Sequence, residues 1–204
     1  MELAVSILIG YLIGSINPAY LISRMRGFDI RSRGSGNAGA SNALVTMGKL
    51  TGIGCAVFDI LKATAVYKLA EMIFPGAEAV GIMAGAACIL GHIFPLWMGF
   101  KGGKGLASVA GTMLAYDWKL FLIVVVCEVI LVVIIDYICA ASVSFPVVLT
   151  VLYAVRGGAM IGIVTLSAIV VIMLIKHISN IKRIIAGEEV HFSILYKKDK
   201  KEKV

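Results

Sequence analysis

Three clusters of polar residues interrupt an otherwise apolar chain, and the first lies between residues 29 and 42. Its members best suited to contact an anion are Arg33, Gly34, Ser35, Gly36, Asn37, Gly39 and Asn42. Glycines allow backbone amides to converge on an anion without obstruction by a Cβ, and serine and asparagine add neutral donors. The stretch therefore predicts a phosphate-binding loop, with a flexible basic loop as the alternative.

The same stretch also matches the GxGxxG pattern of dinucleotide-binding proteins, through Gly34, Gly36 and Gly39. In those proteins the motif joins a strand to a helix within a βαβ unit. Here it lies between two apolar segments of membrane-spanning length, so we reject the dinucleotide interpretation.

The second cluster begins at His92 and reaches the run Lys101-Gly102-Gly103-Lys104. Two lysines beside a glycine pair place mobile point charges next to backbone that phosphate oxygens can approach. The sequence lacks the GxxxxGK[ST] spacing of a P-loop here. The alternative is that Lys101 and Lys104 only anchor the chain at the membrane surface.

The third cluster follows the last apolar segment. On a continuing helix His177, Asn180 and Arg183 are three residues apart and lie along one face. Glu189 follows shortly afterwards. A lone histidine at such a place is usually only solvated, but three polar side chains on one face favour a functional role.

The composition indicates which class of protein carries these clusters. The chain has 204 residues, of which 60% are hydrophobic and 15% are charged, and its mean hydropathy is +0.97. Water-soluble domains are less apolar and more charged, and disordered chains are more polar still, so both classes are excluded. The formal net charge of +7 then predicts membrane lipids and phosphorylated small molecules as partners, rather than nucleic acid.

Seven apolar segments are candidate membrane spans. They cover residues 3–22, 52–74, 79–98, 106–116, 120–135, 138–155 and 159–176. Isolated strands cannot satisfy their backbone hydrogen bonds in lipid, so we expect an all-α, polytopic integral membrane protein with about seven transmembrane helices. We expect a single transmembrane domain over residues 1–190 and a basic cytoplasmic tail over residues 191–204.

The positions of the basic residues predict the orientation. With seven spans, the loop 24–49, the loop 101–104, the turn at Asp136 and the tail share one side, and three of these four carry lysine or arginine clusters. We expect this side to be cytoplasmic, with the N-terminus outside and the C-terminus inside. All three polar clusters then face the cytoplasm.

Some ionisable residues fall within predicted spans, among them Asp59, Lys62 and Glu128. Asp59 and Lys62 are one helical turn apart, so we expect an ion pair that lowers the cost of insertion, with substrate contact as the minority alternative. Glu128 is expected to be neutral or to have a partner.

The clusters, in this order and at this spacing, resemble the bacterial acyl-phosphate-dependent glycerol-3-phosphate acyltransferases, the PlsY family. The matching motifs are Gly14-Ser15, the run 34–42, the run 58–62, the run 91–95, the run 100–105 and the run 177–183 with Gly187 and Glu189. The resemblance implies seven spans in the bacterial cell membrane and an active site facing the cytoplasm. It also implies transfer of an acyl chain from acyl phosphate to the 1-hydroxyl of glycerol 3-phosphate, giving lysophosphatidic acid without a metal or other cofactor.

The resemblance further implies roles for individual residues. Ser35, Asn180 and a protonated His177 are the expected catalytic groups, as donors to the tetrahedral oxyanion. The expected substrate-binding residues are Arg33, Gly34, Gly36, Asn37, Gly39, Asn42, Lys49, His92, Lys101, Gly102, Gly103, Lys104, Ser142, Arg183 and Glu189. Because the sequence shows no Ser–His–Asp arrangement and no HxxxxD pair, we expect direct transfer without an acyl-enzyme, in which a substrate phosphate accepts the proton.

Two positions depart from the family pattern. Val45 and Asp136 stand where the family usually has arginine, whose planar fork binds phosphate through two hydrogen bonds. Lys49, Arg31 and Arg33 are candidates to compensate for this loss. A divergent paralogue with a different acceptor therefore stays open, and a small-solute transporter is the alternative from another class. No oligomeric state follows from the sequence.

Overall fold

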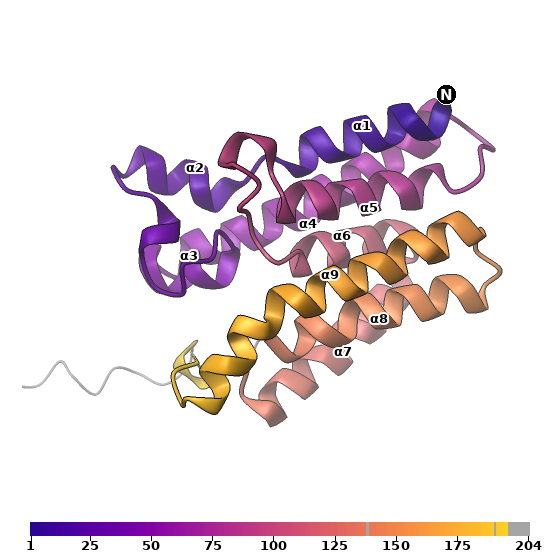
Figure 1. Cartoon of the computed structure of the whole chain (residues 1–204). Helices are drawn as coiled ribbons and strands as arrows, with labels where there is room; N and C mark the ends of the chain where they lie inside the picture. The colour runs from indigo at the N-terminus through magenta and orange to yellow at the C-terminus, as the bar shows by residue number, and fades with distance from the viewer. Residues whose placement is uncertain (138, 190, 196–204) are drawn as a thin grey trace, which may run out of the picture.

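The computed structural model describes residues 1–137, 139–189 and 191–195 (Figure 1). The described residues fold into helices joined by loops, which confirms the expected all-α architecture. The α-helices are α1 (Glu2–Gly14), α2 (Pro18–Met25), α3 (Ala40–Met47), α4 (Lys49–Ile73), α5 (Val80–Ile93), α6 (Leu106–Tyr116), α7 (Trp118–Ile135), α8 (Cys139–Val155) and α9 (Met160–Ile185). Short 3-10 turns lie at Ile30–Ser32, Leu96–Met98 and Phe192–Leu195.

Helix α5 is central: nearly all of its residues are buried, and α1, α4 and α6 pack around it. Helix α1 approaches α5 closely because two glycines face it. A Cβ on Gly10 would overlap the carbonyl oxygen of Ala84, and a Cβ on Gly14 would overlap that of Cys88. Small residues at this spacing allow two helix backbones to touch. The contact fixes the position of α5, and of the loop that follows it, relative to α1.

The first predicted span, residues 3–22, is interrupted. Helix α1 ends at Gly14 and α2 begins at Pro18. Proline has no backbone N–H to continue a helix, and the side chain of Asn17 caps the new helix by accepting a hydrogen bond from the backbone N–H of Tyr20 at 2.8 Å. The apolar run continues across this break, so hydrophobicity alone predicts an unbroken helix.

Helices α7, α8 and α9 form a second group, and α6 lies between them and the helices around α5 (Figure 1). Within the described chain, five helical segments are long and apolar enough to cross a membrane, namely Glu2–Met25, Lys49–Ile73, Val80–Met98, Trp118–Ile135 and Met160–Ile185. Helices α6 and α8 are apolar but shorter. Many large apolar side chains of α7 and α9 are exposed, as expected for surfaces that contact lipid.

The three polar clusters meet at one end of the bundle. The segment around α2 and α3, the loop between α5 and α6 and the end of α9 lie at the left of Figure 1, whereas the N-terminus lies at the opposite end. Part of the stretch expected to be a loop is helical, because α3 folds within it. Gly48 has φ +96°, a conformation that favours glycine, and it turns the chain from α3 into α4.

Replacing Gly10 with alanine should lower the free energy of unfolding by about 1–3 kcal/mol, because the added methyl group must push α1 away from the backbone of α5. Gly54→Ala is the matched control, since Gly54 lies on α4 and nothing is within 4 Å of the position that its Cβ would take. Thermal unfolding of both purified variants in one detergent measures the difference. Equal unfolding temperatures would contradict the close contact between α1 and α5.

Candidate active site

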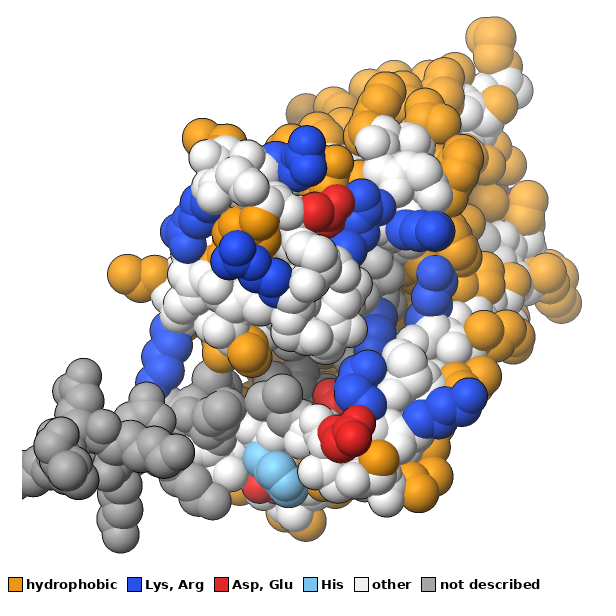
Figure 2. All heavy atoms as spheres, turned by 60° about the vertical axis from the view of Figure 1, so that its left-hand side comes forward, with side chains coloured by type: hydrophobic (Ala, Val, Ile, Leu, Met, Phe, Trp, Pro, Cys, Tyr) orange, Lys and Arg blue, Asp and Glu red, His pale blue; other side chains and the backbone are white. Residues whose placement is uncertain are grey.

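A cavity of about 540 Å³ lies between the two groups of helices, at the end of the bundle where the polar clusters meet. Residues of α3, α4 and α6 line one side, and residues of α7, α8 and α9 line the other. Figure 2 shows this end of the molecule, where lysine and arginine side chains surround a hollow and apolar side chains cover the flank. The cavity is therefore open to a basic surface.

The wall of the cavity is polar near the loops and apolar along the helices. The polar lining includes Ser35, Asn37, Asn42, His92, Lys104, Ser142, His177, Asn180, Arg183 and Glu189. The apolar lining includes Ile60, Ala110, Val125, Val129, Val132 and Phe145. Among the described residues, no group of three or more His, Cys, Asp or Glu side chains is placed to hold a metal ion. The cavity can thus accept a ligand with an anionic head and an apolar chain.

Asn42 organises the first glycine loop. Its amide nitrogen donates to the carbonyl oxygens of Ile30, Arg33 and Asn37 at 3.1, 3.0 and 2.9 Å, and its Oδ1 accepts from the backbone N–H of Ser35 at 3.0 Å. The loop therefore uses both the donors and the acceptor of this side chain. Asn42 shapes the loop, whereas Ser35 is exposed and lines the cavity.

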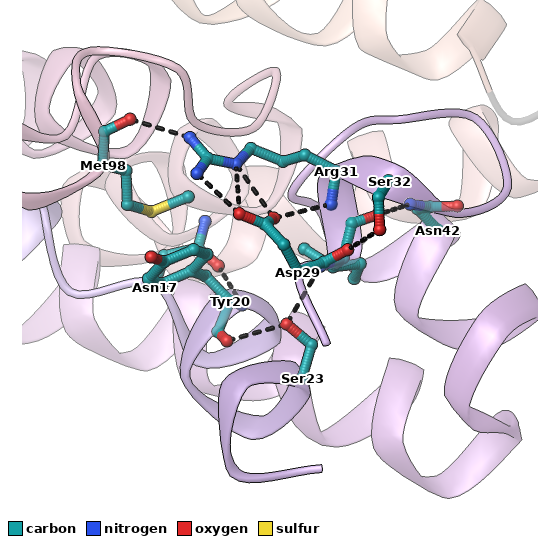
Figure 3. A network of polar contacts seen from close by, with 9 residues as sticks. Asn17, Tyr20, Ser23, Asp29, Arg31, Ser32, Asn42 and Met98 are labelled. Atoms are coloured by element: carbon teal, nitrogen blue, oxygen red, sulfur yellow. Dashed lines mark hydrogen bonds and ion pairs between the residues drawn. The ribbon is translucent and has the colours of Figure 1, made fainter. Parts of the chain in front are cut away.

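Arg31 links the first glycine loop to the turn before the lysine loop (Figure 3). Its guanidinium group forms a two-pronged ion pair with the carboxylate of Asp29, with 2.7 Å between Nη2 and Oδ2, and its Nη1 donates to the carbonyl oxygen of Met98 at 2.8 Å. The hydrogen bonds from Arg31 hold the pKa of Asp29 below its usual value. Met98 belongs to the turn that precedes the lysine loop, so Arg31 acts as a structural link between the loops.

The lysine loop is held against the end of α5. The backbone N–H groups of Gly102 and Gly103 donate to the carbonyl oxygens of Ile93 and His92 at 3.1 and 3.0 Å. Gly103 lies directly against the imidazole of His92, so a Cβ on Gly103 would overlap Nε2. His92 is buried and supports the loop from behind.

Lys104 connects the lysine loop to α9. Its ammonium group contacts Oδ1 of Asn180, and Nδ2 of Asn180 donates to Oε1 of Glu189 at 2.9 Å. Glu189 also accepts from Nε of Arg183 at 2.8 Å. Lysine only donates and a carboxylate only accepts, so these partners fix the orientation of the Asn180 amide. His177, Asn180 and Arg183 all line the cavity, which confirms that they share one face of α9.

The ammonium of Lys104 has an unusual protonation equilibrium. Burial, followed by the positive charge of Arg183, lowers the pKa of Lys104 to about 8. The charge of Lys176 acts in the same direction, whereas Glu189 and Cys139 raise this pKa. An anion bound beside Lys104 favours its charged form, so phosphate binding and protonation of Lys104 are linked.

The hydrogen bond of His177 determines which ring nitrogen is available to a ligand. Its Nδ1 lies 2.7 Å from the carbonyl oxygen of Met173. A carbonyl oxygen only accepts, so Nδ1 carries a proton and Nε2 is left for the ligand. In the neutral ring Nε2 accepts a hydrogen bond, and in the charged ring it donates one.

Val45 and Asp136, where the resemblance leads us to expect arginine, differ in their relation to the cavity. Val45 lies on α3 and lines the cavity. Asp136 is not among the lining residues. Its carboxylate accepts from the backbone N–H and the hydroxyl of Ser193 at 2.6 and 3.0 Å, and it lies 3.0 Å from Nδ1 of His191. These contacts fasten the segment after α9 to the end of α7 and hold Phe192 in the cavity wall.

The structure brings most of the expected site residues together. Those that line the cavity are Gly34, Ser35, Asn37, Gly39, Asn42, His92, Lys104, Ser142, His177, Asn180, Arg183 and Glu189. Those outside its lining are Arg33, Gly36, Lys49, Lys101, Gly102 and Gly103. Arg33 stacks on Phe28, with its guanidinium carbon 3.9 Å from the ring centroid. The expected basic tail, residues 191–204, lies outside the described residues from 196 onward.

Helix α7 provides a wall of the cavity that was not expected from the sequence. Val125, Glu128, Val129 and Val132 line the cavity, and their spacing places them on one helical face. Glu128 accepts a hydrogen bond from the hydroxyl of Ser144 at 2.7 Å, which confirms that it has a partner. Because α7 is apolar all round, only the position of Glu128 could have shown which face turns inward.

The chain matches a known family along most of its length. The profile of the glycerol-3-phosphate acyltransferase family matches residues 4–187. A protein named glycerol-3-phosphate acyltransferase from Allorhizobium ampelinum is 38% identical over 191 residues, which cover 92% of this chain and 90% of the relative. A protein of the same name from Lactiplantibacillus plantarum is 34% identical over 205 residues, which cover 98% of each chain.

Two solved structures have a similar fold. Both are crystal structures of PlsY, an integral membrane glycerol 3-phosphate acyltransferase, one in a glycerol 3-phosphate form and one in a lysophosphatidic acid form. The first has a TM-score of 0.86 and covers 97% of this chain and all of its own, and the second has a TM-score of 0.82 and covers 96% of this chain and 97% of its own. Each is 28% identical to this chain.

These matches decide between the two classes left open by the sequence, an acyltransferase and a solute transporter. The similarity extends from α1 to the end of α9, and so it includes the helices and loops that form the cavity. The protein belongs to the PlsY family of integral membrane glycerol-3-phosphate acyltransferases.

Proposed function

We propose that the protein transfers an acyl chain from acyl phosphate to the 1-hydroxyl of glycerol 3-phosphate, forming lysophosphatidic acid and releasing inorganic phosphate. The observation that carries the proposal is a single cavity with a cationic, glycine-rich mouth and an apolar interior. The mouth suits the phosphate groups of both substrates, and the interior suits an acyl chain. The PlsY structures in glycerol 3-phosphate and lysophosphatidic acid forms support this acceptor and this product.

The phosphate groups bind at the mouth. Lys104 and Arg183 supply positive charge, and the first glycine loop supplies amides and a hydroxyl. Acyl phosphate is already an activated mixed anhydride, so the main task of the protein is to hold two anions close together while neutralising their repulsion. The basic residues Arg33, Lys49 and Lys101 lie outside the cavity lining and attract both substrates toward it.

The transfer is direct. The hydroxyl oxygen of glycerol 3-phosphate attacks the carbonyl carbon of the acyl phosphate, and the former carbonyl oxygen becomes an oxyanion. When the carbonyl reforms, the bond from this carbon to the bridging phosphate oxygen breaks. The departing phosphate takes the proton of the hydroxyl, so no side chain changes its covalent state.

Ser35, His177 and Asn180 surround the reacting atoms in this proposal. A protonated His177 donates from Nε2 to the oxyanion, since its Nδ1 already donates to the carbonyl oxygen of Met173. The hydroxyl of Ser35 and the second N–H of Asn180 donate to the oxyanion. Glu189 keeps the Asn180 amide in the required orientation.

The membrane topology is part of the same proposal. Adding α6 and α8 to the five longer segments gives seven spans, with α1 and α2 counted together. The basic cavity mouth faces the cytoplasm of a bacterial cell, which places the N-terminus outside and the C-terminus inside. Residues 1–190 form one transmembrane domain, and residues 191–204 form a basic tail.

Purified protein in nanodiscs, supplied with palmitoyl phosphate and labelled glycerol 3-phosphate, should form labelled lysophosphatidic acid and inorganic phosphate in equal amounts. Palmitoyl-CoA in place of palmitoyl phosphate should give no product. Thin-layer chromatography and a phosphate assay measure the two products. Absence of product with palmitoyl phosphate, together with counterflow of a labelled solute in proteoliposomes, would contradict the proposed acyl transfer.

Direct transfer also predicts that Ser35 is never acylated. Brief mixing with labelled acyl phosphate in the absence of glycerol 3-phosphate, followed by acid quench and mass spectrometry, should recover unmodified protein. Ser35→Ala should slow the reaction about 10²–10³-fold through loss of one oxyanion donor. An acyl adduct on Ser35 in the intact protein would show that the mechanism is covalent.

The low pKa of Lys104 predicts a fall in phosphate affinity at alkaline pH. Below about pH 8 the ammonium is charged and binds phosphate, and above it the neutral amine does not. We therefore expect kcat/KM, which reports the free enzyme, to decrease as pH rises through about 8. Lys104→Arg keeps its charge over this range and should lack the alkaline decrease. A decrease of the same midpoint in both proteins would assign it to another group.

Val45→Arg should increase kcat/KM for glycerol 3-phosphate about 10-fold or more, because a charged donor in the cavity wall adds about 1.5–3 kcal/mol of interaction with phosphate. Leu50→Arg is the matched control, since it adds the same charge at an exposed position outside the cavity lining. Steady-state kinetics with varied glycerol 3-phosphate measures both. Equal effects of the two substitutions, or a decrease for Val45→Arg alone, would indicate that the cavity is built for another acceptor.

A further inference from the structure

We propose that Asp59, Lys62 and His92 form a positioning cluster that sets the two phosphate-binding loops at a fixed separation. The inference rests on the proposed function for the identity of the ligand, an organic or inorganic phosphate. Asp59, Lys62 and His92 are 2%, 5% and 4% exposed, so the cluster is almost completely removed from solvent. None of the steps of acyl transfer described above uses Asp59 or Lys62.

The ammonium group of Lys62 links α4 to the end of α1 and to the break that follows it. It lies 2.6 Å from Oδ1 of Asp59 and donates to the carbonyl oxygens of Gly14 and Ile16 at 2.9 and 2.7 Å. Gly14 is the last residue of α1 and Ile16 lies in the break before α2, where backbone carbonyls lack the N–H donors that a continuing helix would supply. Lys62 therefore caps α1 at the point where the first span breaks.

The hydrogen bonds of Lys62 indicate which ring nitrogen of His92 carries a proton. The three N–H groups of Lys62 are used by Asp59, Gly14 and Ile16, so Lys62 has none left for Nδ1 of His92 at 3.4 Å. Nδ1 of His92 must then carry its own proton and donate it to Oδ1 of Asp59 at 3.3 Å. The carboxylate of Asp59 thus fixes the ring of His92 in one orientation.

The oriented ring of His92 supports the lysine loop. Gly103 lies against Nε2, and the backbone N–H of Gly103 donates to the carbonyl oxygen of His92 at 3.0 Å. Lys104 is the next residue, so rotation of the ring displaces the ammonium that faces Asn180. Asp59 acts on Lys104 through His92 and Gly103, and it is a positioning residue rather than a catalytic one.

The cluster is also linked to the first glycine loop, through the break between α1 and α2. The break that Lys62 caps ends in Asn17, whose Nδ2 donates to the carbonyl oxygen of Ala38 at 2.7 Å. Ala38 lies within the first glycine loop and is fully buried. A displacement of Lys62 therefore shifts both the lysine loop and the first glycine loop, so this residue sets the distance between them.

The test separates positioning from the stability that a buried ion pair provides. Asp59→Asn alone leaves the charge of Lys62 without its partner, and such variants can fail to fold. The double variant Asp59→Asn/Lys62→Met carries no buried charge at either position and keeps similar side-chain volumes. Lys68→Met is the matched control, because Lys68 lies on the same helix in an exposed ion pair with Glu71.

We expect the folded double variant to raise KM for glycerol 3-phosphate and the dissociation constant for inorganic phosphate about 10–100-fold, because small misplacements of binding groups have effects of this size. The alkaline decrease of kcat/KM should move above pH 8, toward the ordinary lysine range, as Lys104 leaves its buried position. Steady-state kinetics and phosphorus NMR titration of the protein in nanodiscs measure these quantities. Lys68→Met should behave as the intact protein does.

Three outcomes overturn the proposal: unchanged phosphate affinity in the double variant, an unchanged midpoint of the alkaline decrease, or an equal loss in Lys68→Met. If the double variant does not fold, Asp59→Glu replaces it, since it retains the charge and moves the carboxylate by one methylene group. Normal phosphate affinity in folded Asp59→Glu would then also overturn the proposal. Inorganic phosphate binding is measured without acyl transfer, so a failure of the proposed reaction leaves this test intact.

Discussion

The charge of Lys62 lies inside the helix bundle, and an ammonium group is tolerated there only when each of its N–H groups has an acceptor. Two of the acceptors are the carbonyl oxygens of Gly14, at the end of α1, and of Ile16, in the break before Pro18, so the ammonium lies where the first span is interrupted. Over the length of α1, Gly10 and Gly14 bring this helix into close contact with the backbone of α5. The need to satisfy one buried cation therefore influences helix length, helix packing and the position of both loops.

The cavity mouth combines positively charged side chains with neutral amide groups. Arg31 pairs with Asp29, donates to the carbonyl oxygen of Met98 and is not among the residues that line the cavity, so it contributes to the shape of the first loop. Lys104 and Arg183 are the lysine and arginine residues that line the cavity, and because the pKa of Lys104 is lowered, an anion bound beside it favours its charged form. Phosphate binding at the cavity mouth and protonation of Lys104 therefore favour each other.

Much of the site could be predicted from the sequence because polar residues are conspicuous in an apolar chain. The glycine loops, the row from His177 to Arg183 and the ion pair of Asp59 with Lys62 were all expected, and the structure brings them to one end of the bundle. The sequence could not show that Asn42 forms its hydrogen bonds within the loop, or that His92 packs against Gly103. Both facts depend on how the chain folds back on itself. The break before Pro18 was missed since the apolar run continues through it. The α7 wall was missed because its helix is apolar on every face.

Asp136 occupies a position where an arginine was expected, and it fastens the segment after α9 to the end of α7. Phe192, in that segment, is part of the cavity wall, and the N-terminus lies at the opposite end of the bundle (Figure 1). This arrangement has a practical consequence for the design of expression vectors. An affinity tag or fluorescent fusion attached shortly after residue 195 is close to Phe192 in the wall of the cavity, whereas one attached before Met1 lies at the opposite end of the bundle from this segment.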